Sequence, residues 1–260
     1  MAEHARIALV TGAAQGIGRQ TAVELAGRGH IVALNDLRPA DETLREVKAA
    51  GGDGVLVVGD IAYEETVVRM VEAIVRRFGQ IDVLVNNAGV SLLQAAEHTT
   101  LTDWEQVIRV NLTGPFLLCR EVGREMLDRR SGSIVNVASV AGLLGVADRA
   151  AYNSSKHGLI GLTRTLAAEW GGRGVRVNAV CPGWVKTPMD DKDQAAGIYA
   201  DADIVNRIPM ARFATPEDVA RAIAFLADPL QSAFVNGTCL SVDGGWAGDG
   251  GWDRLRIENR

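Results

Sequence analysis

The chain has 260 residues, of which 47% are hydrophobic, 23% charged and 5% aromatic, a balance typical of a soluble globular protein. Its 27 Lys and Arg residues against 32 Asp and Glu residues give a net charge of −5, which opposes the counterion-release binding used by nucleic-acid proteins. We therefore predict no nucleic-acid partner. A chain of this length can bury a full core without disulfides or metals, so one domain over residues 1–260 is expected.

The three cysteines Cys119, Cys181 and Cys239 form neither a CxxC pair nor a Cys/His cluster with zinc-ligand spacing. We predict buried, reduced thiols and no metal site. The first residues lack a signal-peptide layout, and no apolar run approaches the ~18 residues of a membrane span. These features predict a cytoplasmic protein that does not enter a membrane.

Short apolar runs alternate with longer segments of helical periodicity along the whole chain. This alternation predicts strand-helix-strand units around a parallel sheet, covered by helices on both faces because most runs are apolar throughout. The sequence thus predicts one doubly wound α/β domain of the Rossmann type with a seven-stranded parallel sheet. The predicted strands are Ile7–Val10, Ile31–Asn35, Val55–Val58, Val83–Asn86, Ser133–Val137, Val175–Val180 and Leu240–Val242.

A glycine-rich turn, Thr11 to Gly18, follows the first predicted strand and opens a helical segment. Glycines permit a tight turn, let a phosphate approach the backbone and leave helix N–H groups directed at negative charge. The spacing is G-x-x-x-G-x-G, whereas the common dinucleotide motif is G-x-G-x-x-G. At this point a simple turn is the alternative to a dinucleotide site.

The second predicted strand leads to Asp36, eighteen residues after Gly18. A carboxylate here can accept hydrogen bonds from both ribose hydroxyls of NAD and would repel the additional phosphate of NADP. The sequence therefore favours NAD as the cofactor. Arg38 weakens this inference because a guanidinium could bind that phosphate, and a solvated loop acid is the alternative interpretation of Asp36.

Two predicted helices begin with capping signals. Thr102 and Glu105 fit a capping box. Further along, Thr215 is followed by a proline and two acidic residues, which suit an N-cap, the first helical turn and the positive end of the helix dipole.

Ser139 follows the fifth predicted strand, and Tyr152 and Lys156 stand four residues apart in a helical segment. This spacing places the phenol and the ammonium on one helix face, although a surface pair is the alternative. A free phenol titrates near pH 10, so proton transfer near neutrality requires a pKa lower by about 3 pH units, or ~4 kcal/mol. A nearby ammonium favours the phenolate. His157 points about 100° away from Lys156 and is predicted not to be catalytic.

Together these segments resemble the short-chain dehydrogenase/reductase family over essentially the whole chain. The glycine spacing that differs from the common motif is this family's own form. The matching segments, in the family's order, are Thr11–Gly18, Asp60, Asn86–Gly89, Asn111, Ser139, Tyr152 with Lys156, Pro182 and Gly183 with Thr187, and Asp243–Gly245.

The resemblance implies roles for individual residues. Tyr152 would be the general acid/base and Ser139 would bind the substrate oxygen. Lys156 would lower the pKa of Tyr152 and bind the nicotinamide ribose, and Asn111 would lie in a distorted helix that holds a water for proton relay. The implied cofactor-binding residues are Gly12, Gln15, Gly16, Ile17, Gly18, Asp36, Leu37, Asp60, Ile61, Asn87, Ala88, Gly89, Tyr152, Lys156, Pro182, Gly183, Val185 and Thr187.

The implied activity is hydride transfer between NAD(H) and a secondary alcohol or ketone. One alternative is a 3-oxoacyl-acyl-carrier-protein reductase, an enzyme that usually prefers NADPH, which Asp36 disfavours. Another is a non-catalytic NAD-binding regulator, which the complete set of Ser139, Tyr152 and Lys156 disfavours. The resemblance also implies a homotetramer, with the helices around Val107–Met126 and Ser154–Trp170 as dimer-forming elements.

Two segments interrupt the alternation: Trp184–Arg212, predicted as a substrate lid, and the tail Gly244–Arg260. The acidic lid favours a small polar alcohol, such as a sugar or polyol, or a cyclic secondary alcohol over an anionic acyl-carrier partner. The alternative interpretation is that these acids only solvate a surface helix. In the tail we predict that Trp252 packs on a neighbouring subunit. The lid acids are Asp190, Asp191, Asp193, Asp201 and Asp203, and the implied pocket wall is Val90–Leu93, Val140–Gly145, Asn153 and Trp184.

Overall fold

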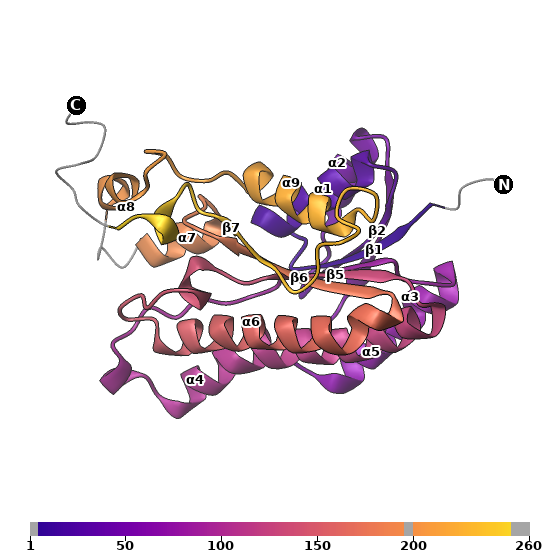
Figure 1. Ribbon diagram of the computed structural model, residues 1–260, viewed down its shortest axis with the longest axis horizontal. Coiled ribbons are helices and arrows are strands. Elements are labelled where there is room, and N and C mark those ends of the chain that lie inside the picture. Colours follow the sequence, from indigo (N-terminus) through magenta and orange to yellow (C-terminus); the bar gives the residue numbers. More distant parts are fainter. Residues whose placement is uncertain (1–4, 195–199, 251–260) are drawn as a thin grey trace.

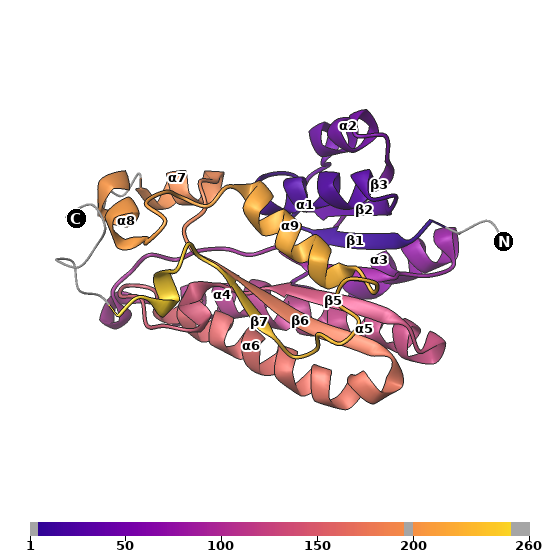
Figure 2. The ribbon, with the colours of Figure 1, turned by 45° about the horizontal axis from the view of Figure 1, so that its top comes forward.

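A seven-stranded parallel sheet forms the centre of the protein, in a computed structural model that describes residues 5–194 and 200–250. The strand order is β3-β2-β1-β4-β5-β6-β7, and Figures 1 and 2 show helices on both faces. Every predicted strand is present with its ends within two residues of the prediction. The strands are β1 Ile7–Thr11, β2 Ile31–Asp36, β3 Asp53–Val58, β4 Val83–Asn86, β5 Gly132–Val137, β6 Val175–Pro182 and β7 Cys239–Val242.

The helices divide between the two faces of the sheet (Figure 1). One face carries α1 Gly16–Gly27, α2 Asp41–Ala49 and α9 Pro216–Ala227. The other face carries α3 Glu64–Phe78, α4 Leu101–Ile108, α5 Gly114–Arg129 and α6 Ala150–Trp170. The short helices α7 Pro188–Gln194 and α8 Asp201–Arg207 belong to the predicted lid.

Side chains of the central strands point alternately to the two faces of the sheet and contribute to a hydrophobic core on each face. In β1, Leu9 packs in the cluster that contains Leu84 and Leu118, whereas Val10 packs in the cluster that contains Leu25 and Ile223. Successive side chains of a strand point to opposite faces, so an apolar run fills the space beneath both helical layers. This confirms the predicted doubly wound architecture.

The chain leaves β1 toward β2 and β3 on one side and resumes at β4 on the other side of β1. The loops after β1 and β4 therefore diverge, and a crevice forms at the carboxyl ends of these two strands. This position in the sheet, which follows from strand order, is where the predicted site residues gather.

The predicted cap of α9 is confirmed, and that of α4 is wrong by two residues. The Thr215 hydroxyl accepts a hydrogen bond from the Asp218 N–H (3.3 Å), while the Asp218 carboxylate accepts one from the Thr215 N–H (2.9 Å). Helix α4 begins at Leu101, and the capping side chain is Thr100, which accepts from the Asp103 N–H (3.2 Å). The same Thr-x-x-acid spacing occurs there two residues before Thr102, so the sequence offered two overlapping starts.

We expect Thr215→Ala to lower the free energy of unfolding by about 1 kcal/mol, because the first turn of α9 loses its side-chain acceptor. The melting temperature should fall by about 2–4 °C in a thermal scan. Thr215→Ser keeps the hydroxyl and serves as the control. Equal melting temperatures for the alanine and serine variants would contradict the assigned cap.

Candidate active site

A cavity of about 510 Å³ runs along the carboxyl edge of the sheet. It reaches from Asp36 at the end of β2 to Ser139, Tyr152 and Lys156 beyond β5 and in α6. All the predicted catalytic and cofactor-binding residues line it except Gly18 and Asn111. Residues that are far apart in the chain are therefore brought to one hollow, as the sequence predicted.

The glycine turn is tightly closed and tied to the end of β4. Gly12 and Gly16 have φ values of +64° and +56°, which favour glycine. A Cβ on Gly18 would lie 2.1 Å from the Gly12 carbonyl oxygen, so Gly18 closes the turn rather than lining the cavity. The Asn87 side-chain amide donates to the carbonyl oxygens of Thr11 (2.8 Å) and Gly12 (3.2 Å).

Asn87 is predicted to bind the cofactor. In the structure its amide groups also hold the loop after β4 in place. The Thr11 hydroxyl accepts hydrogen bonds from the N–H groups of Asn87 and Ala88, both at 3.0 Å. These bonds hold the loop after β4 against the glycine turn. The compact turn leaves its backbone open to the cavity, which fits a cofactor phosphate.

Asp36 is fixed at the far end of the cavity. Its carboxylate oxygens accept hydrogen bonds from the N–H groups of Ala14 (3.0 Å) and Leu37 (2.8 Å). Asp60, after β3, accepts from the Ala62 N–H (2.9 Å). Arg38 also lines this end of the cavity, so both the carboxylate and the guanidinium considered in the sequence face the same space.

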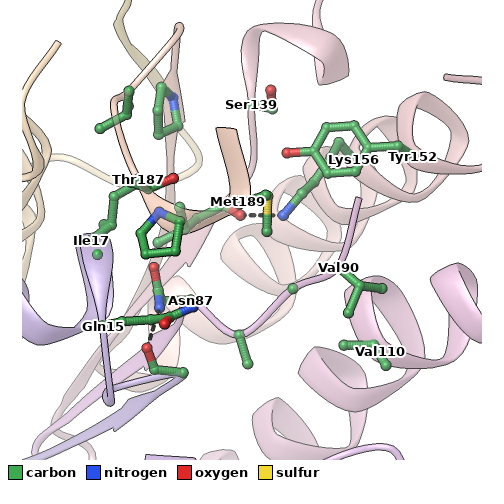
Figure 3. A pocket seen from close by; sticks show the side chains of 18 of the residues that line it. Gln15, Ile17, Asn87, Val90, Val110, Ser139, Tyr152, Lys156, Thr187 and Met189 are labelled. Carbon is green, nitrogen blue, oxygen red and sulfur yellow. Dashed lines mark hydrogen bonds between the residues drawn. The ribbon is translucent and has the colours of Figure 1, made fainter. Parts of the chain in front are cut away.

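Tyr152 and Lys156 lie side by side, as their spacing predicted. The Lys156 ammonium nitrogen is 5.5 Å from the centroid of the Tyr152 ring and donates to the Val137 carbonyl oxygen (2.8 Å). Figure 3 shows both side chains reaching into the cavity from α6. Lys156 is buried, and burial lowers its pKa to about 8.

Ser139 precedes the short 3-10 turn η3 Val140–Gly142, and its hydroxyl accepts from the Ala141 N–H (3.1 Å). A Cβ on Gly142 would lie 2.9 Å from the Lys156 carbonyl oxygen. Glycine there lets this turn pack closely on α6, which brings Ser139 to the same side of the cavity as Tyr152 (Figure 3).

Asn111 lies in a π-helical turn, η2 Arg109–Thr113, between α4 and α5. The predicted helix distortion is therefore present. The buried Asn111 side chain accepts from the Val90 N–H (2.8 Å) and donates to the Val90 carbonyl oxygen (2.9 Å) and to the Ser155 hydroxyl (3.2 Å). These bonds fix the segment after β4 against α6. His157, in contrast, is exposed and does not line the cavity.

The substrate end of the cavity differs from the implied wall. Of Val90–Leu93 only Val90 lines it, and Leu143 and Asn153 do not. Leu143 instead packs against the cluster that contains Leu159, because η3 turns its following residue toward the core. Sequence reasoning missed Gln106, Val110, Val146 and Arg149 as lining residues, whereas Met189 belongs to the predicted segment Trp184–Arg212. For Arg149 a signal was present: a cation three residues before Tyr152.

The lid acids are mostly engaged within the lid. Lys186 forms ion pairs with Asp190 (3.1 Å) and Asp201 (2.5 Å), and Asp203 accepts from the Ala200 N–H (2.9 Å) at the start of α8. Asp191 is exposed, the side chain of Asp193 lies outside the described part, and of the other acids only Asp190 lines the cavity. Of the described acids in the predicted lid, Asp190 therefore contributes to the cavity lining, and it is paired with Lys186.

Trp246 stacks on Trp184, with ring centroids 4.7 Å apart and planes 7° from parallel. The start of the tail thus covers the lid base of its own chain. The predicted subunit contact of Trp252 lies outside the described residues. Among residues 5–194 and 200–250, no helix combines the length and apolar character needed to cross a membrane.

Cys119 and Cys181 are buried, Cys239 is half-buried, and all three thiols are free. No group of three or more His, Cys, Asp or Glu side chains within the described ranges could hold a metal ion.

A doubly wound parallel sheet with a glycine turn and an open cavity at its carboxyl edge defines a dinucleotide-binding α/β protein. Residues 12–247 match the family model described as enoyl-(acyl carrier protein) reductase. The chain belongs to the short-chain dehydrogenase/reductase family, whose fold binds a nicotinamide cofactor and whose members are oxidoreductases acting on CH–OH or keto groups.

Two relatives and one solved structure illustrate this membership. The chain is 42% identical over 244 residues to a D-threitol dehydrogenase of Mycolicibacterium smegmatis, covering 93% of this chain and 92% of that protein. It is 41% identical over 244 residues to a 3-oxoacyl-[acyl-carrier-protein] reductase of Synechocystis sp., covering 93% and 96%. A Beutenbergia cavernae protein described as an NAD(P)-dependent gluconate 5-dehydrogenase, crystallised with NADP at low occupancy, matches with a TM-score of 0.88, 42% identity and coverage of 94% and 97%.

Proposed function

We propose that the protein transfers a hydride between NAD(H) and a secondary alcohol or ketone, and that the alcohol is a small polar or cyclic one. One observation carries the proposal: the Lys156 ammonium lies 5.5 Å from the Tyr152 ring centroid, in a cavity that holds Asp36 at its other end. The first feature suits proton transfer from a hydroxyl, and the second suits an unphosphorylated ribose.

The bound nicotinamide supplies the hydride-transfer chemistry. Tyr152, as the phenolate, accepts the proton of the substrate hydroxyl, and the Lys156 ammonium stabilises that phenolate because an adjacent opposite charge favours the ionised form. The Ser139 hydroxyl, whose oxygen accepts from the Ala141 N–H, directs its hydrogen to the substrate oxygen. Asn111 holds the distorted turn from which a water relays the proton.

The predicted residues along the cavity would each hold a different part of the cofactor. The glycine turn would bind the pyrophosphate, Asp36 the adenosine ribose, Asp60 and Ile61 the adenine, and the segment from Pro182 to Thr187 the nicotinamide amide. These assignments agree with the closed turn at Gly12 and Gly18 and with the fixed carboxylate of Asp36.

Different relatives favour different substrate classes. The D-threitol dehydrogenase acts on a polyol by its name, which favours a small alcohol here. The 3-oxoacyl-[acyl-carrier-protein] reductase favours the alternative of thioester reduction. A non-catalytic NAD-binding regulator is a third candidate, disfavoured by the complete set of Ser139, Tyr152 and Lys156 in one cavity.

An absorbance screen at 340 nm separates these candidates. The purified protein is assayed with NAD⁺ and NADP⁺ against D-threitol, gluconate, cyclohexanol, 4-hydroxycyclohexanecarboxylate and its carboxamide, and in reverse against a 3-oxoacyl thioester. We expect NAD⁺-dependent oxidation of an alcohol. Dominant thioester reduction with NADPH would establish the alternative enzyme, and tight NAD⁺ binding with no turnover across the panel would favour the regulator.

Asp36→Asn should lower the preference for NAD⁺ over NADP⁺ by about 100-fold in kcat/KM. The variant keeps the side-chain shape but removes the charge that opposes the 2′-phosphate, and juxtaposed like charges cost several kcal/mol. Steady-state kinetics with both cofactors measures the ratio. Arg38→Gln is the matched test of the neighbouring guanidinium and should change the ratio in the opposite direction. An unchanged ratio in Asp36→Asn would refute the role of this carboxylate.

We also propose a cytoplasmic location and a homotetramer. The free thiols of Cys119 and Cys181 agree with a reducing compartment. Helices α5 and α6 correspond to the segments predicted to form dimers, and Phe116 on α5 is 43% exposed. Light scattering on the purified protein measures the mass of the assembly.

A further inference from the structure

A pair of indole rings lies at the substrate end of the cavity. Trp184 follows β6 and lines the cavity, whereas its stacking partner Trp246, in the 3-10 turn η5 Trp246–Gly248, does not. The Cζ atom of Arg149 is 5.7 Å from the centroid of the Trp184 ring and 5.8 Å from that of the Tyr152 ring. Trp184 therefore belongs to the wall near the proposed proton acceptor, and Trp246 supports that wall from outside the cavity.

The turn that carries Trp246 is fixed by its own sequence. Gly244 and Gly245 have φ values of +62° and +93°, which favour glycine. The buried Asp243 carboxylate accepts hydrogen bonds from the N–H groups of Gly245 (3.0 Å) and Ala247 (2.8 Å), and the Trp246 N–H donates to the Asp243 carbonyl oxygen (3.2 Å). The Trp246 indole is thus attached to a closed turn whose backbone has little freedom.

The same turn contacts both ends of the predicted lid. At the start of the lid, a Cβ on Gly183 would lie 2.9 Å from the Asp243 Cα atom, so glycine lets the residue before Trp184 approach the turn closely. At the end of the lid, the Met210 N–H donates to the Gly244 carbonyl oxygen (3.1 Å). The turn therefore holds the two ends of the lid together, and the stacked rings extend this contact toward the cavity.

Aromatic rings at this spacing attract each other, which restricts the orientation of each ring. A pocket wall that cannot move excludes larger substrates, and one methylene group in an apolar pocket changes kcat/KM by about 10–200-fold. We propose that Trp246 is a positioning residue that fixes the Trp184 indole, and that this wall limits the size of the alcohol that reaches Tyr152. This inference rests on the proposed function and narrows its substrate class to small alcohols.

The first test compares two cyclic alcohols of different size, cyclohexanol and 4-tert-butylcyclohexanol. For the wild type, kcat/KM should be at least about 10-fold higher for cyclohexanol. Trp246→Ala should lower this ratio by about 10-fold, the upper range expected for one lost ring stack. The change should appear in KM and leave kcat for cyclohexanol within about twofold, because the reacting groups keep their places. Trp246→Phe keeps a ring and should retain most of the ratio.

A double variant tests whether Trp246 acts through Trp184. In a Trp184→Ala background the wall is absent, so the further change Trp246→Ala should leave the ratio of the two alcohols unchanged. Trp104→Ala is the matched control, because Trp104 is also half-buried but does not line the cavity, and it should not alter the ratio. Equal effects of Trp246→Ala in both backgrounds would refute the positioning role.

A second test does not depend on turnover. Fluorotryptophan replaces the five tryptophans of the chain, and single Trp→Phe variants assign their fluorine NMR resonances. In Trp246→Ala the Trp184 resonance should broaden or split, because the unsupported indole samples more than one orientation, while those of Trp104 and Trp170 should keep their line widths. Thermal scans check that each variant is folded, and Trp246→Phe supplies the comparison if the alanine variant is not.

The two proposals fail in different ways. If the wild type oxidises both alcohols equally well, or if Trp246→Ala changes neither their ratio nor the Trp184 resonance, the size-limiting wall is refuted while the dehydrogenase activity stands. If neither cyclic alcohol is oxidised, calorimetric titration of both into the enzyme with NAD⁺ gives the same ratio from dissociation constants. A Trp246-dependent ratio in binding without turnover of any alcohol in the panel supports the wall and refutes the proposed reaction.

Discussion

Tyr152→Phe is expected to lower kcat by about 10²–10⁴-fold, the usual contribution of a positioned proton-transfer group. The substitution removes one oxygen atom and leaves the ring, which Lys156 and Arg149 both approach. The cavity should therefore keep its shape, and affinity for NAD⁺ should change little. Turnover is followed at 340 nm with the best alcohol of the panel, and NAD⁺ binding by calorimetry.

The matched control for this substitution is Tyr63→Phe. Tyr63 is 51% exposed and does not line the cavity, so the same loss of a hydroxyl should leave kcat unchanged. Retention of more than about a tenth of wild-type turnover in Tyr152→Phe would exclude this residue as the proton-transfer group.

Lys156→Met should lower activity and raise stability together. Without the ammonium the Tyr152 phenolate loses the opposite charge that favours it, so kcat for alcohol oxidation should fall by about 10²–10³-fold at pH 7 and its pH profile should move upward. A shift of the profile separates an electrostatic role from a structural one, because lost packing would lower kcat without displacing its pH dependence.

The stability gain follows from burial of the ammonium. Burial lowers the pKa of Lys156 from 10.5 to about 8, so the folded state holds the proton less tightly than the unfolded state. Below pH 8 the wild type carries the whole cost of the buried charge, on the order of 3 kcal/mol. Between about pH 8 and 10.5 the unfolded chain binds more protons than the folded one, so wild-type stability rises through this window relative to Lys156→Met.

Urea denaturation at pH 7 and pH 10 measures both effects. We expect Lys156→Met to be more stable than the wild type at pH 7, by about 1–3 kcal/mol once the lost bond to the Val137 carbonyl is included, and the two proteins to converge at pH 10. Lys48→Met, at an exposed position on α2, should show no such convergence. A destabilised Lys156→Met at pH 7 would contradict the charge-burial argument.

The parts of the fold that were predicted correctly depend on local pattern. A strand such as β1, apolar from Ile7 to Val10, has no stable place other than the interior of a sheet covered on both faces. The spacing of Tyr152 and Lys156 fixes their common helix face whatever surrounds them. The predicted start of α4 was wrong because Thr100 and Thr102 each stand three residues before an acidic residue, so either hydroxyl could cap the helix. Packing of the helix determines which of the two is the N-cap.

The substrate end could not be predicted in the same way, because its residues come from elements whose relative positions depend on tertiary contacts. Leu143 turns inward since η3 packs on α6, and Arg149 reaches Tyr152 and Trp184 through the turn that precedes α6. The acidic composition of the predicted lid disfavours an anionic ligand. In the structure, however, Lys186 forms ion pairs with two of these acids.

The amino-acid sequence by itself determined the order of strands and helices, the closed glycine turn, and the helical pair of Tyr152 and Lys156, because each of these depends on neighbours within one segment. Only the tertiary structure decided which side chains meet at the substrate end, namely Arg149, Ser91 and Trp184. Their contacts join residues more than thirty positions apart, and such distances are set by how the helices pack on the sheet.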